Sequence, residues 1–427
     1  MRSNYRKIGD YIELVDERNK DLSIDLLLGL SINKQFIPSV ANIVGANMTN
    51  YKIIRKGQFA CSIMQVRRDK KMPVAFLEDF EEAIISQAYP VFRIKDERVL
   101  LPKYLMMWFT RSEFDRHACF LAVGGVRGSL EWEDFLEMEL PIPSIEKQRE
   151  IVKEYNTVVN RIKLNEQLNK KLEETAQALY KHWFVDFEFP ISAEQAAEMG
   201  NPELEGKPYK SFGGKMVWNE ELGKEVPEGW EVKNVKGFTI DMKSGGTPNR
   251  MIDEYWDSEE VPWLKTGELK NSIVIDSEEY ISRIALKKSS AKILPVNTVL
   301  IAMYGEGKTK GQVGYLKKEA STNQACCAMI CENEEKASFL YYHLRTNRDE
   351  IVSIAIGGAQ PNLSKNIIEE IRIIEPNESA LNSHPFIQIL KSKEGYTKEI
   401  KSLEGLRNLF LSKMTQVEIE EKEVVSG

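Results

Sequence analysis

The feature that most constrains this sequence is an internal repeat. Residues 56–78 (KGQFACSIMQVRRDKKMPVAFLE) and residues 295–317 (PVNTVLIAMYGEGKTKGQVGYLK) match at a constant offset. In both blocks two apolar, β-forming runs flank a polar segment that contains Lys or Arg. Each block therefore predicts a strand, a basic loop and a second strand. Self-similarity over such a length predicts two copies of one folded unit.

The similarity continues on both sides of these blocks. Residues 85–88 (ISQA) parallel residues 322–325 (TNQA), and each leads into an apolar strand and then a helical stretch. Two homologous units are therefore expected, at residues 1–144 and 227–377. Their alternation of strands and helices predicts an α/β (α+β) fold.

A long helix is predicted after each unit, at residues 145–185 and 385–418. Their apolar positions recur at steps of three, four and seven residues, at Ile151, Tyr155, Val158, Ile162, Leu168, Leu172 and Leu179 in the first and at Tyr396, Ile400, Leu403, Phe410 and Met414 in the second. Neither helix has enough apolar surface to be stable alone. If a pseudo-twofold axis relates the two units, the helices pack as an antiparallel coiled coil.

The rest of the chain is polar. Residues 186–226 are rich in Gly, Pro and Glu and predict a linker, and residues 419–427 form an acidic tail. The net charge of −7 argues against a nucleic-acid partner. However, residues 1–145 contain 20 basic and 20 acidic side chains, and the excess acid lies mainly in the linker and the tail. A local cationic face can still bind phosphate.

Composition also limits location and metal chemistry. No signal-like or membrane-spanning apolar run is present, so a cytoplasmic protein is expected. The five cysteines include no C-x-x-C pair, and ACCAMIC at residues 325–331 predicts reduced thiols buried in a strand. No metal site is expected.

At this point the sequence resembles a known family. Residues 141–151 (PIPSIEKQREI), 176–189 (AQALYKHWFVDFEF) and 244–269 (SGGTPNRMIDEYWDSEEVPWLKTGEL) are similar to the DNA-specificity (S) subunits of type I restriction–modification systems. The resemblance covers nearly the whole chain. It departs in the first unit, which has LVDERNKDLSIDLL where the second opens with SGGTP.

The resemblance implies a function and partners. Each unit would be a target recognition domain that reads one half of a bipartite site in double-stranded DNA, and the different openings imply two different half-sites. The helices would separate the domains and bind two methyltransferase subunits, which restriction (motor and nuclease) subunits then join. S-adenosylmethionine would bind the methyltransferase, and ATP and Mg would bind the restriction subunit, so no cofactor is expected in this chain.

The candidate DNA contacts are cations and polar loops at equivalent places in the two units. In the first unit they are Lys34, Arg55, Arg67, Arg68, Lys70 and Lys71. In the second they are Ser244, Gly245, Gly246, Thr247, Lys265, Thr266, Lys287, Lys288, Tyr304, Lys308, Lys310 and Gln312. The backbone N–H groups of residues 244–247 are a candidate phosphate cradle. The alternative for each is an ordinary solvated turn, and for Arg55 a surface turn before a strand is slightly favoured.

Enzymatic alternatives find little support. Residues 302–309 fit a relaxed A-x-x-x-x-G-K-T pattern, but the following GQVGYLKK predicts a strand where a nucleotide-binding loop requires a helix. No N-P-P-Y run of an amino-methyltransferase is present. The chain is therefore expected to be non-catalytic. Two rivals stay open: a solitary interaction protein that binds methyltransferase subunits without productive DNA recognition, and an enzyme, either a nuclease or a P-loop protein, hidden in the repeat units.

Overall fold

The computed structural model describes residues 5–39, 47–122, 128–305, 308–355 and 362–415. It divides into two compact units, one formed by Met1–Ile162 with Ser402–Gly427 and the other by Lys163–Lys401. We call them unit 1 and unit 2. Each holds one copy of the repeat and a part of both long helices. Among the described residues, no helix is both long enough and apolar enough to cross a membrane.

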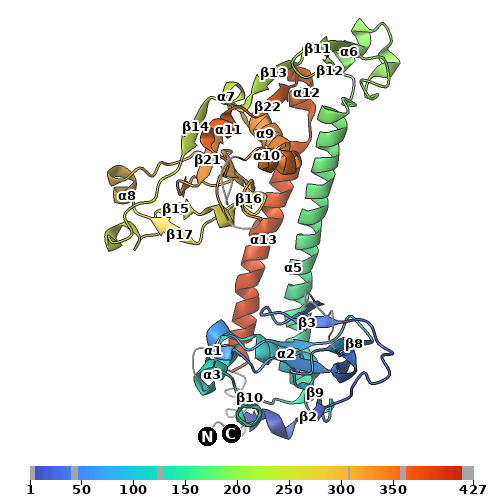
Figure 1. Cartoon of the computed structure of the whole chain (residues 1–427), viewed down its shortest axis with the longest axis vertical. Coiled ribbons are helices and arrows are strands. Elements are labelled where there is room, and N and C mark those ends of the chain that lie inside the picture. The colour runs from blue at the N-terminus through green and yellow to red at the C-terminus, as the bar shows by residue number, and fades with distance from the viewer. Residues whose placement is uncertain (1–4, 40–46, 123–127, 306–307, 356–361, 416–427) are drawn as a thin grey trace, which may run out of the picture. The chain divides into compact units, whose positions relative to one another are not determined.

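Unit 1 is built around a four-stranded sheet with the order β2-β9-β6-β7 (Figure 1). The strands of the unit are β1 (Tyr5–Lys7), β2 (Ile12–Val15), β3 (Leu28–Leu30), β4 (Phe36–Pro38), β5 (Lys52–Arg55), β6 (Phe59–Cys61), β7 (Val74–Phe76), β8 (Glu82–Ile85), β9 (Val91–Ile94) and β10 (Glu139–Pro141). Its short helices are α1 (Val66–Asp69), α2 (Pro102–Thr110), α3 (Ser112–Leu121) and α4 (Trp132–Glu137). Helix α2 packs against β7. The core between sheet and helices is aromatic, with the rings of Phe59 and Phe92 stacked 5.2 Å apart.

Unit 2 has a five-stranded sheet, β14-β21-β18-β19-β16, and a three-stranded sheet, β17-β15-β20 (Figure 1). Its repeat contains the strands β13 (Glu231–Asn234), β14 (Asp241–Ser244), β15 (Val261–Leu264), β16 (Ser272–Val274), β17 (Glu279–Ile281), β18 (Val299–Ala302), β19 (Val313–Leu316), β20 (Ser321–Thr322), β21 (Cys326–Ile330) and β22 (Arg372–Glu375). The short helices are α7 (Val235–Phe238), α8 (Arg283–Lys288), α9 (Glu334–Thr346), α10 (Arg348–Ser353), α11 (Lys365–Glu369) and α12 (Glu378–Ser383). Helix α9 packs against β18 and β19.

The two units share one topology. Strands β2, β9, β6 and β7 occupy the same sheet positions as β14, β21, β18 and β19. The terminal pair β1–β10 likewise corresponds to β13–β22, and both pairs are antiparallel. The strand, loop and strand predicted from the repeat are therefore confirmed. Phe59 pairs with Phe76, but Val299 rather than Thr298 pairs with Tyr315, so the first strand is shifted by one residue from the sequence offset.

The two long helices are α5 (Ile145–Tyr180) and α13 (Phe386–Lys413), which lie side by side in Figure 1. Helix α5 ends in a π-helical turn at Lys181–Val185. In unit 2 the Asn169 side chain donates to Thr397 at 3.3 Å, and one turn further along α5 Glu173 pairs with Lys393. From the first contact to the second, the residue number rises on α5 and falls on α13. This confirms that the two helices are antiparallel. In unit 1 the two helices contribute to one hydrophobic cluster, which includes Val152 of α5 and Leu411 of α13.

The predicted helix-packing residues are buried to different degrees. Val158, Ile162 and Met414 are buried, whereas the remaining nine are half-buried: Ile151, Tyr155, Leu168, Leu172, Leu179, Tyr396, Ile400, Leu403 and Phe410. The heptad pattern missed several fully buried positions, among them Ala176, Phe386 and Leu390. It also missed two buried polar side chains, Asn165 and Lys393, because periodicity of apolar residues gives no signal for them.

Residues 186–226 differ from the predicted linker, because they fold. Ser192 forms a capping box with Gln195 at the start of α6 (Ala193–Glu198), and β11 (Met216–Asn219) pairs with β12 (Lys224–Pro227) as a hairpin. Phe189 stacks on Trp230 with ring centroids 4.9 Å apart. Its glycines serve the turns that join these elements, with positive φ at Gly200, Gly206, Gly213 and Gly223, while a few aromatic side chains anchor the segment to the core. The predicted tail, 419–427, lies outside the described residues.

Candidate nucleic-acid interface

In unit 1 the basic loop is a short helical turn, α1, that presents cations to solvent. Val66 is buried beneath it, and the residues on either side, Gln65 and Lys70, adopt left-handed backbone angles with φ of 63° and 52°. The four predicted cations of this loop, Arg67, Arg68, Lys70 and Lys71, are exposed. Arg68 pairs with the adjacent Asp69 at 2.6 Å. For the other three, the described part of the chain offers no carboxylate within salt-bridge distance.

Lys34 was wrongly predicted as a DNA contact. Its ammonium group is buried, donates to the carbonyl of Phe109 and pairs with Asp115 at 2.8 Å. Burial lowers the pKa of Lys34, and the Asp115 carboxylate opposes that shift. The Lys34 side chain holds its loop against α2 and α3. Phosphate cannot reach the ammonium group unless these contacts break.

Arg55 lies on the surface but is already neutralised. Its guanidinium contacts Glu17 at 2.7 Å and also pairs with Glu82 across the β5–β8 ladder. The structure therefore agrees with a surface turn next to a strand, the alternative favoured for Arg55. A phosphate would have to displace two carboxylates to bind there.

The predicted phosphate cradle at residues 244–247 loses two of its donors, because the N–H groups of Gly245 and Gly246 are occupied. Gly246 N–H donates to the Thr322 carbonyl at 2.8 Å, and Gly245 N–H donates to the Cys326 carbonyl at 3.4 Å. A Cβ on Gly245 would lie 2.2 Å from Thr322 O. The glycines thus permit close approach of two backbone segments. Thr247 stays exposed, and its hydroxyl donates to Gln324.

Several predicted contacts of unit 2 converge on the turn between β20 and β21. Three backbone hydrogen bonds join this turn to other segments: Gly246 N–H to Thr322 O at 2.8 Å, Asn323 N–H to Leu264 O at 3.0 Å, and Met303 N–H to Ala325 O at 2.8 Å. Predicted residues 247, 265 and 304 each follow directly on one of these bonded residues. The turn at 322–325 therefore brings together the three candidate segments that contain residues 247, 265 and 304. Their separation in the sequence gave no indication of this contact.

The cations around this turn differ in availability. Lys265 pairs with Glu279 at 2.9 Å and Glu278 at 3.4 Å, and these carboxylates raise its pKa. Lys287 and Lys288 are exposed in the last turn of α8, with no salt bridge among the residues that the structure describes. Thr266 is half-buried at the start of a short 3-10 helix.

The loop after β18 is held by a residue that sequence reasoning missed. The Arg348 guanidinium donates to the carbonyls of Lys308 at 2.8 Å and Lys310 at 2.7 Å. Tyr304 and Lys308 are exposed and Lys310 is half-buried. The Gln312 side chain accepts from the backbone N–H of Lys270 at 3.2 Å, which is a structural contact. Residues 306 and 307 of the nucleotide-loop pattern lie outside the described residues, and the run leads into strand β19 rather than a helix.

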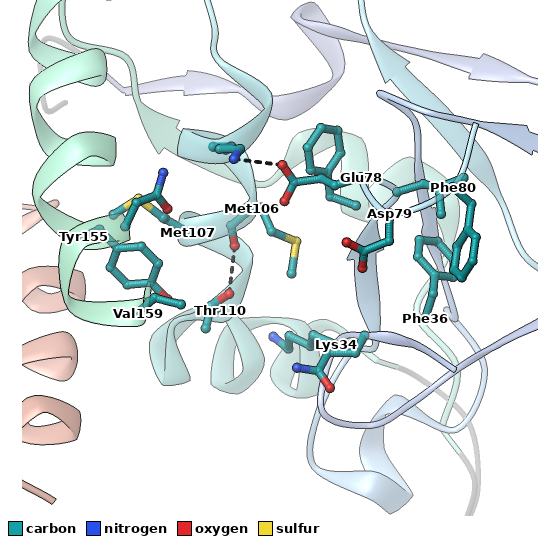
Figure 2. A pocket seen from close by; sticks show the side chains of 15 residues that line it. Lys34, Phe36, Glu78, Asp79, Phe80, Met106, Met107, Thr110, Tyr155 and Val159 are labelled. Carbon is teal, nitrogen blue, oxygen red and sulfur yellow. Dashed lines mark hydrogen bonds and ion pairs between the residues drawn. The ribbon is translucent and has the colours of Figure 1, made fainter. Parts of the chain in front are cut away.

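Unit 1 also contains a hollow of about 470 Å³. Figure 2 shows it lined by Met106 and Thr110 of α2, Tyr155 and Val159 of α5, and Phe80. Two of its charged groups, Glu78 and Lys103, pair with each other at 2.8 Å. Among the described residues no group of three His, Cys, Asp or Glu side chains is arranged to hold a metal ion. Of the three cysteines predicted as buried thiols in a strand, Cys326 and Cys327 are buried in β21, whereas Cys331 follows the end of that strand and is half-buried.

Two topologically equivalent units, each with an exposed basic loop at the same place, define a protein built by internal duplication. The family model described as "Type I restriction modification DNA specificity domain" matches residues 41–174 and 227–419. The chain therefore belongs to this family of type I restriction–modification specificity subunits, whose general role is recognition of a DNA target.

Known relatives agree with this assignment. The MjaIX specificity subunit of Methanocaldococcus jannaschii is 27% identical over 329 residues, which span 76% of this chain and 71% of that protein. The HindI specificity subunit of Haemophilus influenzae is 24% identical over 432 residues, covering 91% of this chain and 92% of its own length. The crystal structure of the S subunit from M. genitalium has a similar fold, with a TM-score of 0.55 at 15% identity over 96% of this chain and 95% of that one.

Proposed function

We propose that this chain binds double-stranded DNA at a two-part sequence and directs methyltransferase and restriction subunits to it. The observation that supports this most strongly is the duplication of one topology, with exposed cations after the equivalent strands β6 and β18. Two similar readers in one chain suit a target with two separate halves. Because their loops differ in sequence, the halves would differ as well.

In this proposal the chain itself is non-catalytic. S-adenosylmethionine would bind two methyltransferase subunits, and ATP and Mg would bind the restriction subunits. The long helices α5 and α13, each shared by both units, would set the gap between half-sites and provide the docking surface for the methyltransferases. A location in the cytoplasm, where such subunits meet DNA, follows from the same proposal.

The test is co-expression with the methyltransferase subunit of the same operon, followed by sequencing of methylated bases in the host DNA. A new methylated motif with two defined parts and a fixed gap is the expected result. A stable complex without new methylation would instead support the rival interaction protein. Absence of any complex, with both proteins folded, would contradict the proposed function.

A further inference from the structure

The turn at 322–325 of unit 2 presents one side chain outward from the point where the candidate segments meet. Thr322, Asn323 and Ala325 are tied by backbone hydrogen bonds to residues 246, 264 and 303. Gln324, between them, is exposed. The sequence predicts the neighbouring loops as DNA contacts, and the repeat places Gln87 of unit 1 at the position of Gln324.

The backbone beneath Gln324 is fixed. The Asn323 side chain accepts from Ala325 N–H at 3.1 Å, and the Asn323 carbonyl accepts from Cys326 N–H at 3.2 Å. Gly245 lies so close that its Cβ would be 2.3 Å from the Asn323 carbonyl oxygen. The backbone that carries Gln324 is therefore ordered before any ligand binds, so binding requires no ordering of the turn, which favours selective contacts.

The carboxamide of Gln324 is itself oriented. The Thr247 hydroxyl donates to Gln324 Oε1 at 2.6 Å. An amide oxygen has two lone pairs, so one acceptor site remains beside the two N–H donors of Nε2. In the described part of the chain Nε2 has no hydrogen-bond partner. An acceptor next to a donor on one planar group matches N6 and N7 of adenine in the major groove.

Cations that suit phosphate lie on the adjoining segment. A Cβ on Gly246 would be 2.3 Å from Ser290 Oγ, so the segment after α8 contacts the same glycine loop. Lys287 and Lys288 are exposed just before that contact. Phosphate contacts fix position and base contacts supply specificity, and this surface offers groups of both kinds.

We propose that Gln324, oriented by Thr247, determines specificity in unit 2 by reading an adenine of its half-site. This inference rests on the proposed function, because it requires that the chain reads DNA. Gln324 contacts the base and Thr247 is a positioning residue.

The experiment compares methylated motifs produced by the methyltransferase complex containing wild-type chain, Gln324→Ala or Thr247→Val. In Gln324→Ala one adenine of one half-site is expected to lose its preference by about tenfold, the lower range for a bidentate base contact. Thr247→Val should weaken preference at the same position and nowhere else. Asn366→Ala removes an exposed amide on α11 and is the matched control, with an unchanged motif expected.

If a variant no longer supports methylation, its specificity is measured by DNA binding instead. Affinities of the purified complex are compared for two duplexes that differ only at that adenine. The inference requires the affinity ratio between the duplexes to fall in Gln324→Ala, and a ratio equal to wild type overturns it. If wild-type chain yields a two-part motif and Gln324→Ala yields the same motif, the inference fails while the proposed function stands. If wild-type chain yields no motif, the proposed function itself fails.

Discussion

At the scale of single residues, burial decides which cations are available to DNA. The Lys34 ammonium is enclosed by Asp115 and the Phe109 carbonyl, whereas Arg67, Lys70 and Lys71 face solvent. Asp115 also accepts from the Met72 N–H at 3.0 Å. The pair therefore links three segments of unit 1.

Replacing Lys34 should damage stability rather than recognition. Lys34→Met leaves Asp115 buried without its counter-charge, and breaking such a pair costs about 3 kcal/mol. Urea unfolding of the chain measures the loss, with exposed Lys20→Met as the control. An unchanged unfolding midpoint in Lys34→Met would show that the pair contributes nothing to stability.

A buried histidine should make unit 2 sensitive to acid. The Nδ1 atom of His343 lies 2.7 Å from the Tyr180 hydroxyl, and burial lowers the pKa of His343 to about 4. The unfolded state, with a pKa of about 6.5, therefore takes up a proton first as pH falls. Stability is fully present above about pH 6.5 and is lost between about 6.5 and 4.

The expected loss between pH 7 and pH 5 is about 2 kcal/mol for this group. Urea unfolding at both values measures it, and His343→Gln should lose less stability over the same interval. His384 is also buried with a lowered pKa, so part of the wild-type dependence should persist. Equal losses in wild type and His343→Gln would contradict the assignment.

At the scale of elements, close backbone contacts explain the glycine loop after β14. Gly245 lies against the turn at 322–325 and Gly246 lies against Ser290, and the N–H groups of both glycines donate to main-chain carbonyls. The sequence alone shows a polar, Gly-rich loop, which is equally typical of a phosphate site. Only the partner strand distinguishes the two, and it lies far away in the chain.

Adding one methyl group should therefore be damaging at Gly245. Gly245→Ala places a Cβ 2.2 Å from Thr322 O, so backbone must move, and we expect a loss of about 2 kcal/mol or more from overpacking. Gly267→Ala is the matched control because nothing lies within 4 Å of its Cβ. Thermal unfolding compares the two variants. Equal stability of both would mean that the loop can relax freely.

Periodicity and repetition predicted the strands, the long helices and their direction. They failed where a local pattern is ambiguous: Lys34 is one more polar residue in a turn, and Phe189 is an isolated aromatic in a Gly- and Pro-rich run. Their partners, Asp115 and Trp230, are distant in sequence. Burial of such residues depends on tertiary contacts that no short window contains.

At the scale of the molecule, both long helices pass from one unit into the other. If the helices set the gap between the two half-sites, a change in helix length should change the number of base pairs in that gap. Inserting seven residues after Ile162 and seven after Lys401 keeps the heptad phase in both helices. It adds about 10 Å, which corresponds to about three base pairs of spacer.

The measurement is the methylated motif produced by the lengthened chain with its methyltransferase subunit. Both half-sites should stay as in wild type while the gap between them grows. The matched control inserts the same residues in α5 alone, which disrupts pairing with α13 and should abolish methylation. An unchanged gap in an active, doubly lengthened chain would show that the helices do not act as the spacer.

The folded segment at 186–226 has a consequence for transplanting recognition between proteins. Phe187 and Phe189 belong to the hydrophobic cluster of unit 2, together with Tyr180 at the end of α5. A graft that begins at residue 227, where the repeat starts, would leave this cluster open. The smallest portable half of the protein therefore extends back into α5, to Lys163 where unit 2 begins. Gene exchanges that preserve folding should have their junctions inside the helix and not at its end.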